Sequence, residues 1–350
     1  METKVLIIGQ GLCGTWLSWF LEEAGCSYIV ADDGNPSSAS HISTGIINPV
    51  SGRLREPAWL IGEVMPFAEK SYAAAGKRFN TSFIAQTPLA DFFPNPQMRL
   101  SFNEQVDGNS YLRRPAEEHD LDEYIHHAFG YGLTEPCYVV HTRKWVSRWR
   151  EHLSATNRLV ETRFETNGKN VLQAAKEQLG ITARKIIFCD GAASAQSSLF
   201  GLLPFALNKG EALTVRIPGL PQEYIYKRTL SLAPAGGDHF YWGSSYVWNT
   251  NDPNPTKEFR EQAEIQLRQL VKLPFTTEDH RAAFRPATVE RRPFAGFHPL
   301  HPELGILNGM GSKGVSLAPW FARQMAGLIT ATGPLQQEIN IERYRRVLSR

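Results

Sequence analysis

The pattern G-x-G-x-x-G at residues 9–14 constrains the fold of this chain more than any other feature, because of where it lies. An apolar run at residues 4–8 precedes it, and apolar side chains with helical spacing follow it over residues 17–24. A second apolar run, at residues 28–31, ends in an Asp-Asp-Gly turn. The first 36 residues therefore predict a strand, a helix and a second strand, joined as a right-handed unit with parallel strands.

Each glycine of this pattern has a physical role in a turn that binds a pyrophosphate. Gly9 permits the tight turn, Gly11 lets the phosphates approach the backbone, and Gly14 lets the helix pack closely on the strand. The helix N-terminus adds partial positive charge. Asp32 ends the second strand, where an acid accepts hydrogen bonds from ribose hydroxyls, and Asp33 is its neighbour in the turn. A glycine turn without a nucleotide is the alternative, and the pattern by itself does not choose between NAD and FAD.

The rest of the chain predicts two domains, each built from several segments. With 350 residues, the chain exceeds the size at which one hydrophobic core usually keeps growing. Residues 223–248 are aromatic-rich around a Gly-Gly turn, which is typical of an antiparallel hairpin. We predict an α/β fold, α+β overall. A Rossmann-like domain with a parallel sheet comprises residues 1–80, 137–205 and 280–350, and a mostly antiparallel domain comprises residues 81–136 and 206–279.

Composition and charge exclude several classes of protein. No run approaches the ~20 apolar residues that a membrane span requires. The 37 basic and 35 acidic side chains give a net charge of +2, which does not favour nucleic acid as a partner. The four cysteines lack the spacing of a disulfide framework or a zinc site, and no metal site is predicted. We expect a cytoplasmic protein without membrane association, and its oligomeric state stays open.

Five further segments carry a resemblance to a known family. They are Ser40–Pro49 (SHISTGIINP), Cys189–Ser194 (CDGAAS), Lys209–Glu211 (KGE), Arg285-Pro286 and Asn308–Ser316 (NGMGSKGVS). Together with residues 9–14, and in order over about 300 residues, they resemble the D-amino-acid oxidase-like family of FAD enzymes. The family includes glycine oxidase, sarcosine oxidase and the oxidase domain of a bifunctional tRNA methylaminomethyluridine enzyme.

The resemblance implies an extended FAD, with the pyrophosphate on the first helix and the flavin under the segments that begin at Ser40 and Gly309. It also implies noncovalent binding, because the cysteine that attaches flavin in monomeric sarcosine oxidases has no counterpart between Arg285 and Gly296. The cofactor-binding residues predicted in this way are Gly9, Gly11, Leu12, Gly14, Asp32, Asp33, Ser40, Thr44, Gly45, Ile46, Gly191, Gly309, Gly311, Ser312, Lys313, Gly314, Val315 and Ser316.

The same resemblance names Arg285 as a catalytic and substrate-binding residue. Several family members use an arginine in this Arg-Pro context to bind a substrate carboxylate bidentately, and the alternative is a structural arginine. The D-amino-acid oxidases have a further tyrosine at the substrate site, on the strand before a Pro-Gly turn. The corresponding position of this chain falls near Ser231. Tyr241 and Tyr246 are therefore candidates to supply the missing hydroxyl, the alternative being a packing role on the hairpin.

Basic side chains at three more positions are candidates for anionic groups. Lys313, within the glycine-rich segment, is predicted to stabilise negative charge on the reduced flavin pyrimidine, as a second catalytic residue. A solvated loop lysine is the alternative. Arg53 and Arg55, just beyond the flavin segment, are candidates to meet an anionic substrate group, with ordinary solvent exposure as the alternative.

These observations lead to one hypothesis for function and two alternatives. The hypothesis is an FAD-dependent oxidoreductase that oxidises the C–N bond of an amino acid, an N-methyl amino acid or a related amine by hydride transfer to flavin N5, with dioxygen as the acceptor. One alternative is a tRNA-modifying oxidase that acts on a carboxymethylamino group. The other is a non-enzymatic flavin-binding protein with a decayed substrate site. It is suggested by Ser231, near the position of the missing tyrosine, and by Asp190, which stands where the corresponding family segment has threonine.

Overall fold

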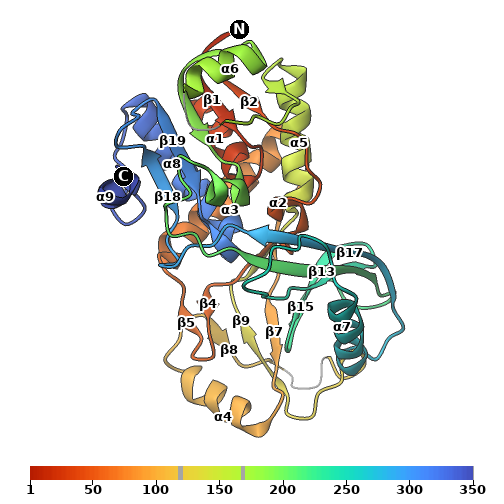
Figure 1. Cartoon of the computed structure of the whole chain (residues 1–350). Helices are drawn as coiled ribbons and strands as arrows, with labels where there is room; N and C mark the ends of the chain where they lie inside the picture. Colours follow the sequence, from red (N-terminus) through yellow and green to blue (C-terminus); the bar gives the residue numbers. More distant parts are fainter. Residues whose placement is uncertain (117–120, 167–169, 350) are drawn as a thin grey trace.

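A computed structural model of the chain describes residues 1–116, 121–166 and 170–349. Two large β-sheets organise the molecule (Figure 1). One lies in the upper half of the view with helices packed around it, and the other lies in the lower half. Both chain termini belong to the upper half. In the part of the chain that the structure describes, no helix is long and apolar enough to cross a membrane.

A six-stranded sheet forms the centre of the upper half. In spatial order its strands are β11 (Leu159–Val160), β2 (Tyr28–Ala31), β1 (Glu2–Ile8), β12 (Thr182–Phe188), β19 (Leu304–Asn308) and β18 (Phe294–Phe297). All neighbours pair in parallel except β18, which is antiparallel to β19. The carboxyl ends of five strands therefore meet at one edge, which is where ligands bind in open sheets of this kind.

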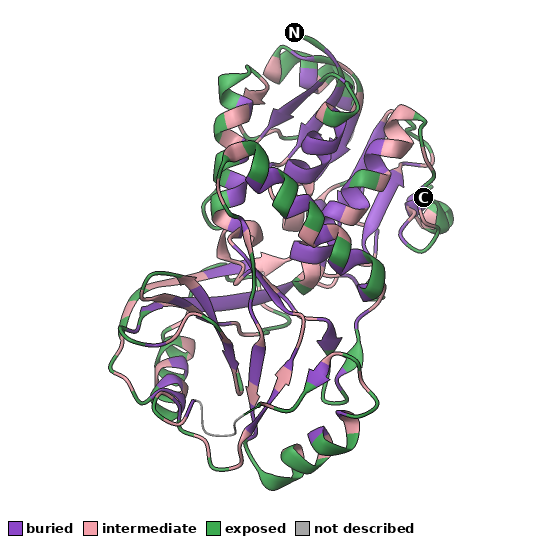
Figure 2. Cartoon of the chain, turned by 180° about the vertical axis from the view of Figure 1, so that it is seen from behind, coloured by how far each residue is buried: buried purple, intermediate pink, exposed green. Residues whose placement is uncertain are grey.

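Helices cover both faces of this sheet because successive side chains of its central strands are apolar and point to opposite faces. On one face lie α1 (Leu12–Glu23), α3 (Ile61–Phe79), α5 (Thr142–Ala155) and α8 (Gly314–Thr330), packed around the fully buried indoles of Trp16, Trp145 and Trp149. On the other face lie α6 (Val171–Leu179), the short turn η3 (Ile341–Tyr344) and the last helix α9 (Arg345–Leu348). Figure 2 shows the resulting purple core between exposed outer helix surfaces.

An eight-stranded sheet forms the lower half. In spatial order its strands are β17 (Thr276–Arg285), β13 (Asn208–Arg216), β16 (His239–Gly243), β15 (Ser231–Gly236), β14 (Ile225–Lys227), β7 (Leu89–Phe92), β9 (Tyr131–Thr134) and β8 (Leu112–Arg113). One face packs on α7 (Lys257–Leu270) through Leu213, Phe240 and Trp242. Because side chains alternate along a strand, the residues between these turn to the opposite face, which we call the open face.

Two small sheets join the halves. The first has the order β3 (Ile46–Ile47), β10 (Tyr138–Val140), β6 (Ile84–Gln86), and the second is a hairpin of β4 (Val50–Ser51) and β5 (Glu56–Pro57). Ile46 packs against Leu89 and Ile225 at the start of the open face. The open face is therefore turned toward the segment that follows the parallel sheet.

The prediction of a parallel first unit and of an antiparallel hairpin at residues 223–248 is confirmed. Two helices, α4 (Pro96–Gln105) and α2 (Ala39–Ile42), lie in segments whose sequence has no helical period of apolar residues. The α4 helix forms because Asn95 accepts a hydrogen bond from the Met98 N–H and Pro96 occupies its first turn, so local capping replaces apolar periodicity. The predicted domain bounds stay a prediction, with β17 running past residue 280.

Candidate active site

Loops from four neighbouring strands meet at the carboxyl edge of the parallel sheet. Gly9 follows β1, Asp32 follows β2, Gly191 lies beyond β12, and Gly309 follows β19. The side-chain amide of Asn308 donates to the Gly191 carbonyl oxygen at 2.8 Å, which ties two of these loops together. The structure thus brings together residues that the sequence placed 300 positions apart.

The glycine-rich turn after β1 has no room for side chains. A Cβ atom on Gly14 would lie 1.9 Å from the Gly9 carbonyl oxygen, and Gly9 itself has a φ of +96°. Gly11 begins α1 without a capping side chain, and the first helical turn holds no acidic residue. The Leu12 N–H donates to the Ser40 hydroxyl at 2.9 Å. Backbone and dipole at this N-terminus are therefore arranged for an anionic group.

Asp32 is held in place beside this turn. Its carboxylate accepts the Gln10 N–H at 2.7 Å and the Gly34 N–H at 2.8 Å, and it pairs with Arg150 at 2.6 Å. Sequence reasoning missed Arg150, because α5 reaches this position only through the packed fold. Asp33 is exposed and accepts a backbone N–H two residues on, so its geometry is that of a turn residue.

The segment that begins at Ser40 crosses from the parallel sheet to the small one. Ser40 lies in the single turn α2, Thr44 and Gly45 follow it, and Ile46 begins β3. A Cβ atom on Gly45 would lie 1.9 Å from the Val140 carbonyl oxygen, and its φ is +75°. Only glycine lets this segment lie flat against β10.

The glycine-rich segment after β19 leads into α8 through the turn η2 (Gly311–Lys313). Gly309 and Gly311 both have positive φ, and Ser312 is exposed. Gly314, Val315 and Ser316 form the first turn of α8, which has no capping side chain and no acidic residue. The N–H groups and the positive end of this helix are thus available to a negatively charged group.

Lys313 lies half-buried at this helix start. Burial lowers the pKa of its ammonium group, and no carboxylate of the described residues opposes that effect. A partly buried ammonium group without a carboxylate partner is stabilised by an anionic neighbour.

Small residues line the centre of the open face. In adjacent register stand Ala212 on β13, Gly243 on β16 and Ser231 on β15, and Gly210 follows on β13. Tyr241 belongs to the same face, since its neighbours in sequence belong to the apolar core on the α7 side. The centre of the open face therefore has no bulky side chain at these four positions.

Arg285, at the end of β17, places its guanidinium over Gly210 on the open face. A Cβ atom on Gly210 would lie 1.9 Å from Nη2 of Arg285, so glycine is what makes room for it. Nη1 donates to Asn208 Oδ1 at 2.7 Å and to the Ser245 carbonyl oxygen at 3.1 Å, and Nη2 donates to Ser244 Oγ at 2.6 Å. All three partners are neutral.

Arg285 therefore has unused capacity for an anion. Of the five N–H donors of a guanidinium, three are used, and two remain without a partner among the described residues. Burial lowers the pKa of the group, and no carboxylate pairs with it among the described residues. A half-buried cation without a carboxylate partner is stabilised when a ligand supplies the opposite charge.

Of the three other predicted substrate residues, Tyr246 contacts Arg285. The centroid of the Tyr246 ring lies 4.5 Å from the Arg285 carbon Cζ. Tyr241 stands on the open face, and Arg53 is exposed at the tip of the β4–β5 hairpin. Arg55, two positions on, is buried at 4% relative exposure.

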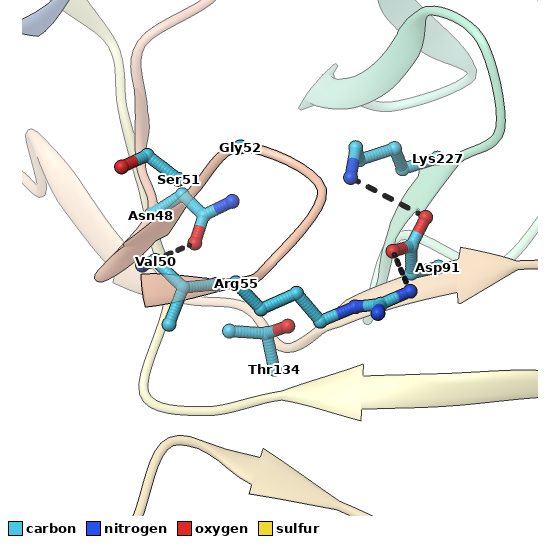
Figure 3. Close-up of a pocket in the computed structure, with 8 residues that line it drawn as sticks. All are labelled: Asn48, Val50, Ser51, Gly52, Arg55, Asp91, Thr134 and Lys227. Atoms are coloured by element: carbon cyan, nitrogen blue, oxygen red, sulfur yellow. Dashed lines mark hydrogen bonds and ion pairs between the residues drawn. The ribbon is translucent and has the colours of Figure 1, made fainter. Parts of the chain in front are cut away.

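A pocket of about 220 Å³ opens between this hairpin and the open face (Figure 3). Arg55 reaches from the hairpin to Asp91 on β7, and Lys227 on β14 reaches the same carboxylate from the other side. Asn48 lies across the pocket from them. Apart from Arg55, sequence reasoning missed these residues, because no local pattern marks them.

Asp190 is the departure from the family pattern that the sequence singled out. It is half-buried beside the glycine-rich turn, where the Ser194 hydroxyl donates to its carboxylate. Burial raises the pKa of Asp190 to about 6. The carboxyl group is thus part of a packed polar cluster and does not enter the pocket above.

Comparison with known proteins gives the family. The family model described as "DAO: FAD dependent oxidoreductase" matches residues 4–328. The chain belongs to this family. It is 24% identical to glycine oxidase of Pseudomonas aeruginosa over 366 residues, covering 96% of this chain and 97% of that protein. It is 23% identical to the tRNA 5-methylaminomethyl-2-thiouridine biosynthesis bifunctional protein MnmC of Marinobacter nauticus, covering 93% of this chain and 55% of that protein, so it spans about half of that relative's length.

Solved structures agree with the fold. Iminodiacetate oxidase from Chelativorans sp. has a TM-score of 0.78 at 17% identity, covering 97% of this chain and 98% of that one. Glycine oxidase from Bacillus cereus has a TM-score of 0.77 at 17% identity, covering 96% of both chains. The predicted mixed fold, with a Rossmann-like parallel part and an antiparallel part, is thereby confirmed.

As a DAO-family protein, the chain is an FAD-dependent oxidoreductase. Its residues fit the cofactor. Gly14 lets α1 pack against the Gly9 carbonyl oxygen so that the turn keeps its shape, the α1 N-terminus suits a pyrophosphate, and Asp32 suits a ribose. The α8 N-terminus and Lys313 offer positive charge for the flavin pyrimidine. The individual cofactor contacts and noncovalent attachment stay predictions.

Proposed function

We propose that this DAO-family oxidoreductase oxidises the C–N bond of a small amine that carries a carboxylate, with dioxygen as the electron acceptor. The observation that carries the proposal is Arg285, a half-buried guanidinium with neutral partners and two unused N–H donors. The names of the relatives, glycine oxidase and iminodiacetate oxidase, point to the same substrate class.

In this proposal the chain's own residues bind and orient the substrate. Gly210 leaves room for the Arg285 guanidinium, which holds the carboxylate in a plane, and Ala212 and Gly243 place no large side chain beside it. Bound FAD supplies a two-electron acceptor for the hydride of the C–H bond next to nitrogen. As the hydride leaves, the nitrogen lone pair forms the C=N bond of an iminium cation, and attack of water on its carbon, with loss of a proton to solvent, leads to the carbonyl product and the released amine.

Lys313 and the start of α8 have a different task. Negative charge that develops on the pyrimidine side of the cofactor is stabilised by a nearby cation and by aligned backbone N–H groups. A dedicated catalytic base is not required, because an amine bound in its neutral form needs only orientation and an acceptor.

The proposal is tested by anaerobic mixing of the purified yellow protein with a panel of amines. The panel contains amino acids of both hands, N-methyl and N-carboxymethyl amino acids, matched amines without a carboxylate, and a carboxymethylaminomethyl uridine nucleoside. Bleaching of the flavin by carboxylate-bearing amines, with peroxide formed on admission of air, is expected. Bleaching by the nucleoside alone favours the tRNA-modifying alternative, and no bleaching by any compound contradicts the proposal and favours the non-enzymatic one. Release of all FAD from the denatured protein tests noncovalent binding.

A further inference from the structure

The pocket between the β4–β5 hairpin and the open face carries a charge that the protein does not neutralise. Arg55 Nη2 lies 3.4 Å from Asp91 Oδ2, and Lys227 Nζ lies 3.3 Å from Asp91 Oδ1. Two cations thus share one carboxylate, and Asp91 is the only acid that lines the pocket among the described residues. The side chains of Arg55 and Asp91 are 5% and 14% exposed, so solvent screens the surplus positive charge only in part.

Most N–H donors of the two cations have no partner in the part of the chain that the structure describes. Besides Asp91, the Arg55 guanidinium donates there only to the Gln105 side chain, at 3.4 Å, so three of its five N–H groups stay free. The Lys227 ammonium contacts the Asp91 carboxylate and turns toward the loop of the hairpin at Gly52 (Figure 3). Both cations are therefore able to hold further acceptor atoms without breaking a contact within the protein.

The remaining lining supplies neutral hydrogen-bond donors. Asn48 Oδ1 accepts the Val50 N–H at 2.9 Å, which leaves its NH₂ group to face the pocket (Figure 3). Thr134 adds a hydroxyl. The volume of about 220 Å³ lies below the roughly 300–1,000 Å³ of pockets for drug-sized molecules, so it suits a ligand of a few heavy atoms.

Arg55 occupies its position at a conformational cost. Its φ is +49°, in the left-handed region that residues with a side chain rarely adopt. The Asn109 side chain donates to its carbonyl oxygen at 2.9 Å, and its guanidinium lies 5.2 Å from the ring centroid of Phe102 on α4. Surrounding groups therefore hold a strained backbone while a cation lines the pocket, and strain of this kind gathers at functional sites.

The pocket shares a wall with the segment that begins at Ser40. Ile46 of that segment packs against Leu89 on β7 and Ile225 on β14. Three polar side chains of the pocket each stand two residues beyond one of these apolar residues: Asn48, Asp91 and Lys227. Residues two apart along a strand lie on one face and are separated by about 7 Å. A ligand in the pocket is therefore about one strand repeat away from the segment that we predict to contact the flavin.

We propose that the pocket of Arg55, Asp91 and Lys227 binds a small oxyanion, either a tetrahedral one such as phosphate or a short-chain carboxylate, and that this anion acts on the neighbouring flavin segment. Cations with neutral hydrogen-bond donors hold oxygen acceptors that carry negative charge. The site is separate from Arg285, because no residue that lines the pocket contacts Arg285 among the described residues. It does not depend on the role proposed for Arg285.

The test titrates the FAD-loaded protein with phosphate, sulfate, acetate and propionate at constant ionic strength, with chloride as the reference anion. Calorimetry measures binding, and the difference spectrum of the oxidised flavin measures the effect on the cofactor segment. We expect saturable binding at one site and a change of the flavin spectrum that saturates over the same concentrations. The two tetrahedral anions and the two carboxylates tell which class the pocket prefers. Repeating each titration in Arg285→Met removes carboxylate binding at that arginine.

Two variants change the charge of the pocket in opposite directions. Lys227→Met removes a positive charge and is expected to weaken oxyanion binding at least about 10-fold, as loss of a hydrogen bond between charged groups does. Asp91→Asn removes the competing negative charge and is expected to strengthen binding. Lys257→Met is the matched control, since Lys257 is exposed on α7 at the other face of the same sheet, and it should keep wild-type affinity.

The outcomes decide the proposal without any measurement of amine oxidation. Binding that persists in Arg285→Met, falls in Lys227→Met and rises in Asp91→Asn supports the site. Absence of saturable binding by all four oxyanions, loss of binding in Arg285→Met, or unchanged affinity in either pocket variant overturns it. Should Asp91→Asn fail to fold, Lys227→Met decides alone. Binding without a change of the flavin spectrum overturns the action on the flavin segment. Failure of the proposed function is recognised separately, by amines that do not bleach the flavin.

Discussion

We predict that Arg285→Met removes most of the affinity for a carboxylate-bearing amine without lowering the stability of the fold. Two N–H donors of the guanidinium are unused by the protein, and a hydrogen bond between charged groups contributes about 1.5–3 kcal/mol. Two such bonds amount to about 3–6 kcal/mol. At about 1.4 kcal/mol for each factor of ten, kcat/KM should fall by at least about 100-fold.

The stability of the variant is the second half of this prediction. The Arg285→Met substitution leaves the Asn208, Ser244 and Ser245 oxygen atoms without their donor, at a cost of about 1 kcal/mol each. The cost is offset because an unpaired cation is no longer buried. The net change should lie within about 1–2 kcal/mol, which is a few °C in Tm for a chain of this size.

Stopped-flow reduction of the flavin and thermal unfolding of the FAD-loaded protein measure both quantities. Arg285→Lys should have an intermediate effect of about 10-fold to 100-fold, because lysine keeps the charge and loses the planar fork. Amines without a carboxylate are the control, and their reduction rates should change by less than about 3-fold, well under the 1.4 kcal/mol of a tenfold effect. The reasoning would be refuted by an equal loss for charged and uncharged amines, or by a large fall in Tm with loss of FAD.

Two further predictions concern the cofactor. Gly14→Ala should abolish FAD retention on gel filtration, because its Cβ atom would lie 1.9 Å from the Gly9 carbonyl oxygen. Gly62→Ala is the control, since a Cβ atom there meets nothing within 4 Å. Normal FAD occupancy in Gly14→Ala would contradict the assignment of the glycine-rich turn to the cofactor. Lys313→Met should lower the flavin reduction potential with FAD still bound, on a scale of about 30 mV for each 1.4 kcal/mol of lost interaction. A potential within about 10 mV of wild type would assign the charge stabilisation to the backbone alone.

The parallel half of the molecule could be predicted from the sequence because glycine positions and apolar periodicity are local signals. The glycines after β1 and after β19 mark backbone conformations and close approaches that other residues cannot adopt, as the contacts of Gly14 and the positive φ of Gly309 show. Apolar periodicity identified α1 for the same reason, because side chains three and four residues apart lie on one face of a helix.

The pocket beside Asp91 could not be predicted from such local signals. Its cations come from a hairpin and from β14, strands that only the register of the eight-stranded sheet brings together. Register depends on pairings between segments more than 100 residues apart, for which one sequence contains no local signal. The sequence did single out Arg55 along with Arg53, but the left-handed turn that buries Arg55 and exposes Arg53 is a property of the folded hairpin.

Asp190 supplies a last prediction, on the dependence of stability on pH. Burial raises its pKa in the folded protein to about 6, above the ordinary value of 3.8, so between these values the folded chain binds more protons than the unfolded chain. The stability that Asp190 contributes is therefore present below pH 3.8 and is lost as the pH rises through about 6. At 1.36 kcal/mol for each pH unit, the loss amounts to about 3 kcal/mol. Asp190→Asn keeps the shape and removes the titration, so its unfolding free energy relative to wild type should rise between about pH 4 and pH 7 by up to about that amount and then level off. Urea unfolding in saturating FAD measures the difference, and a difference that stays constant over this range would show that the carboxyl group does not titrate there.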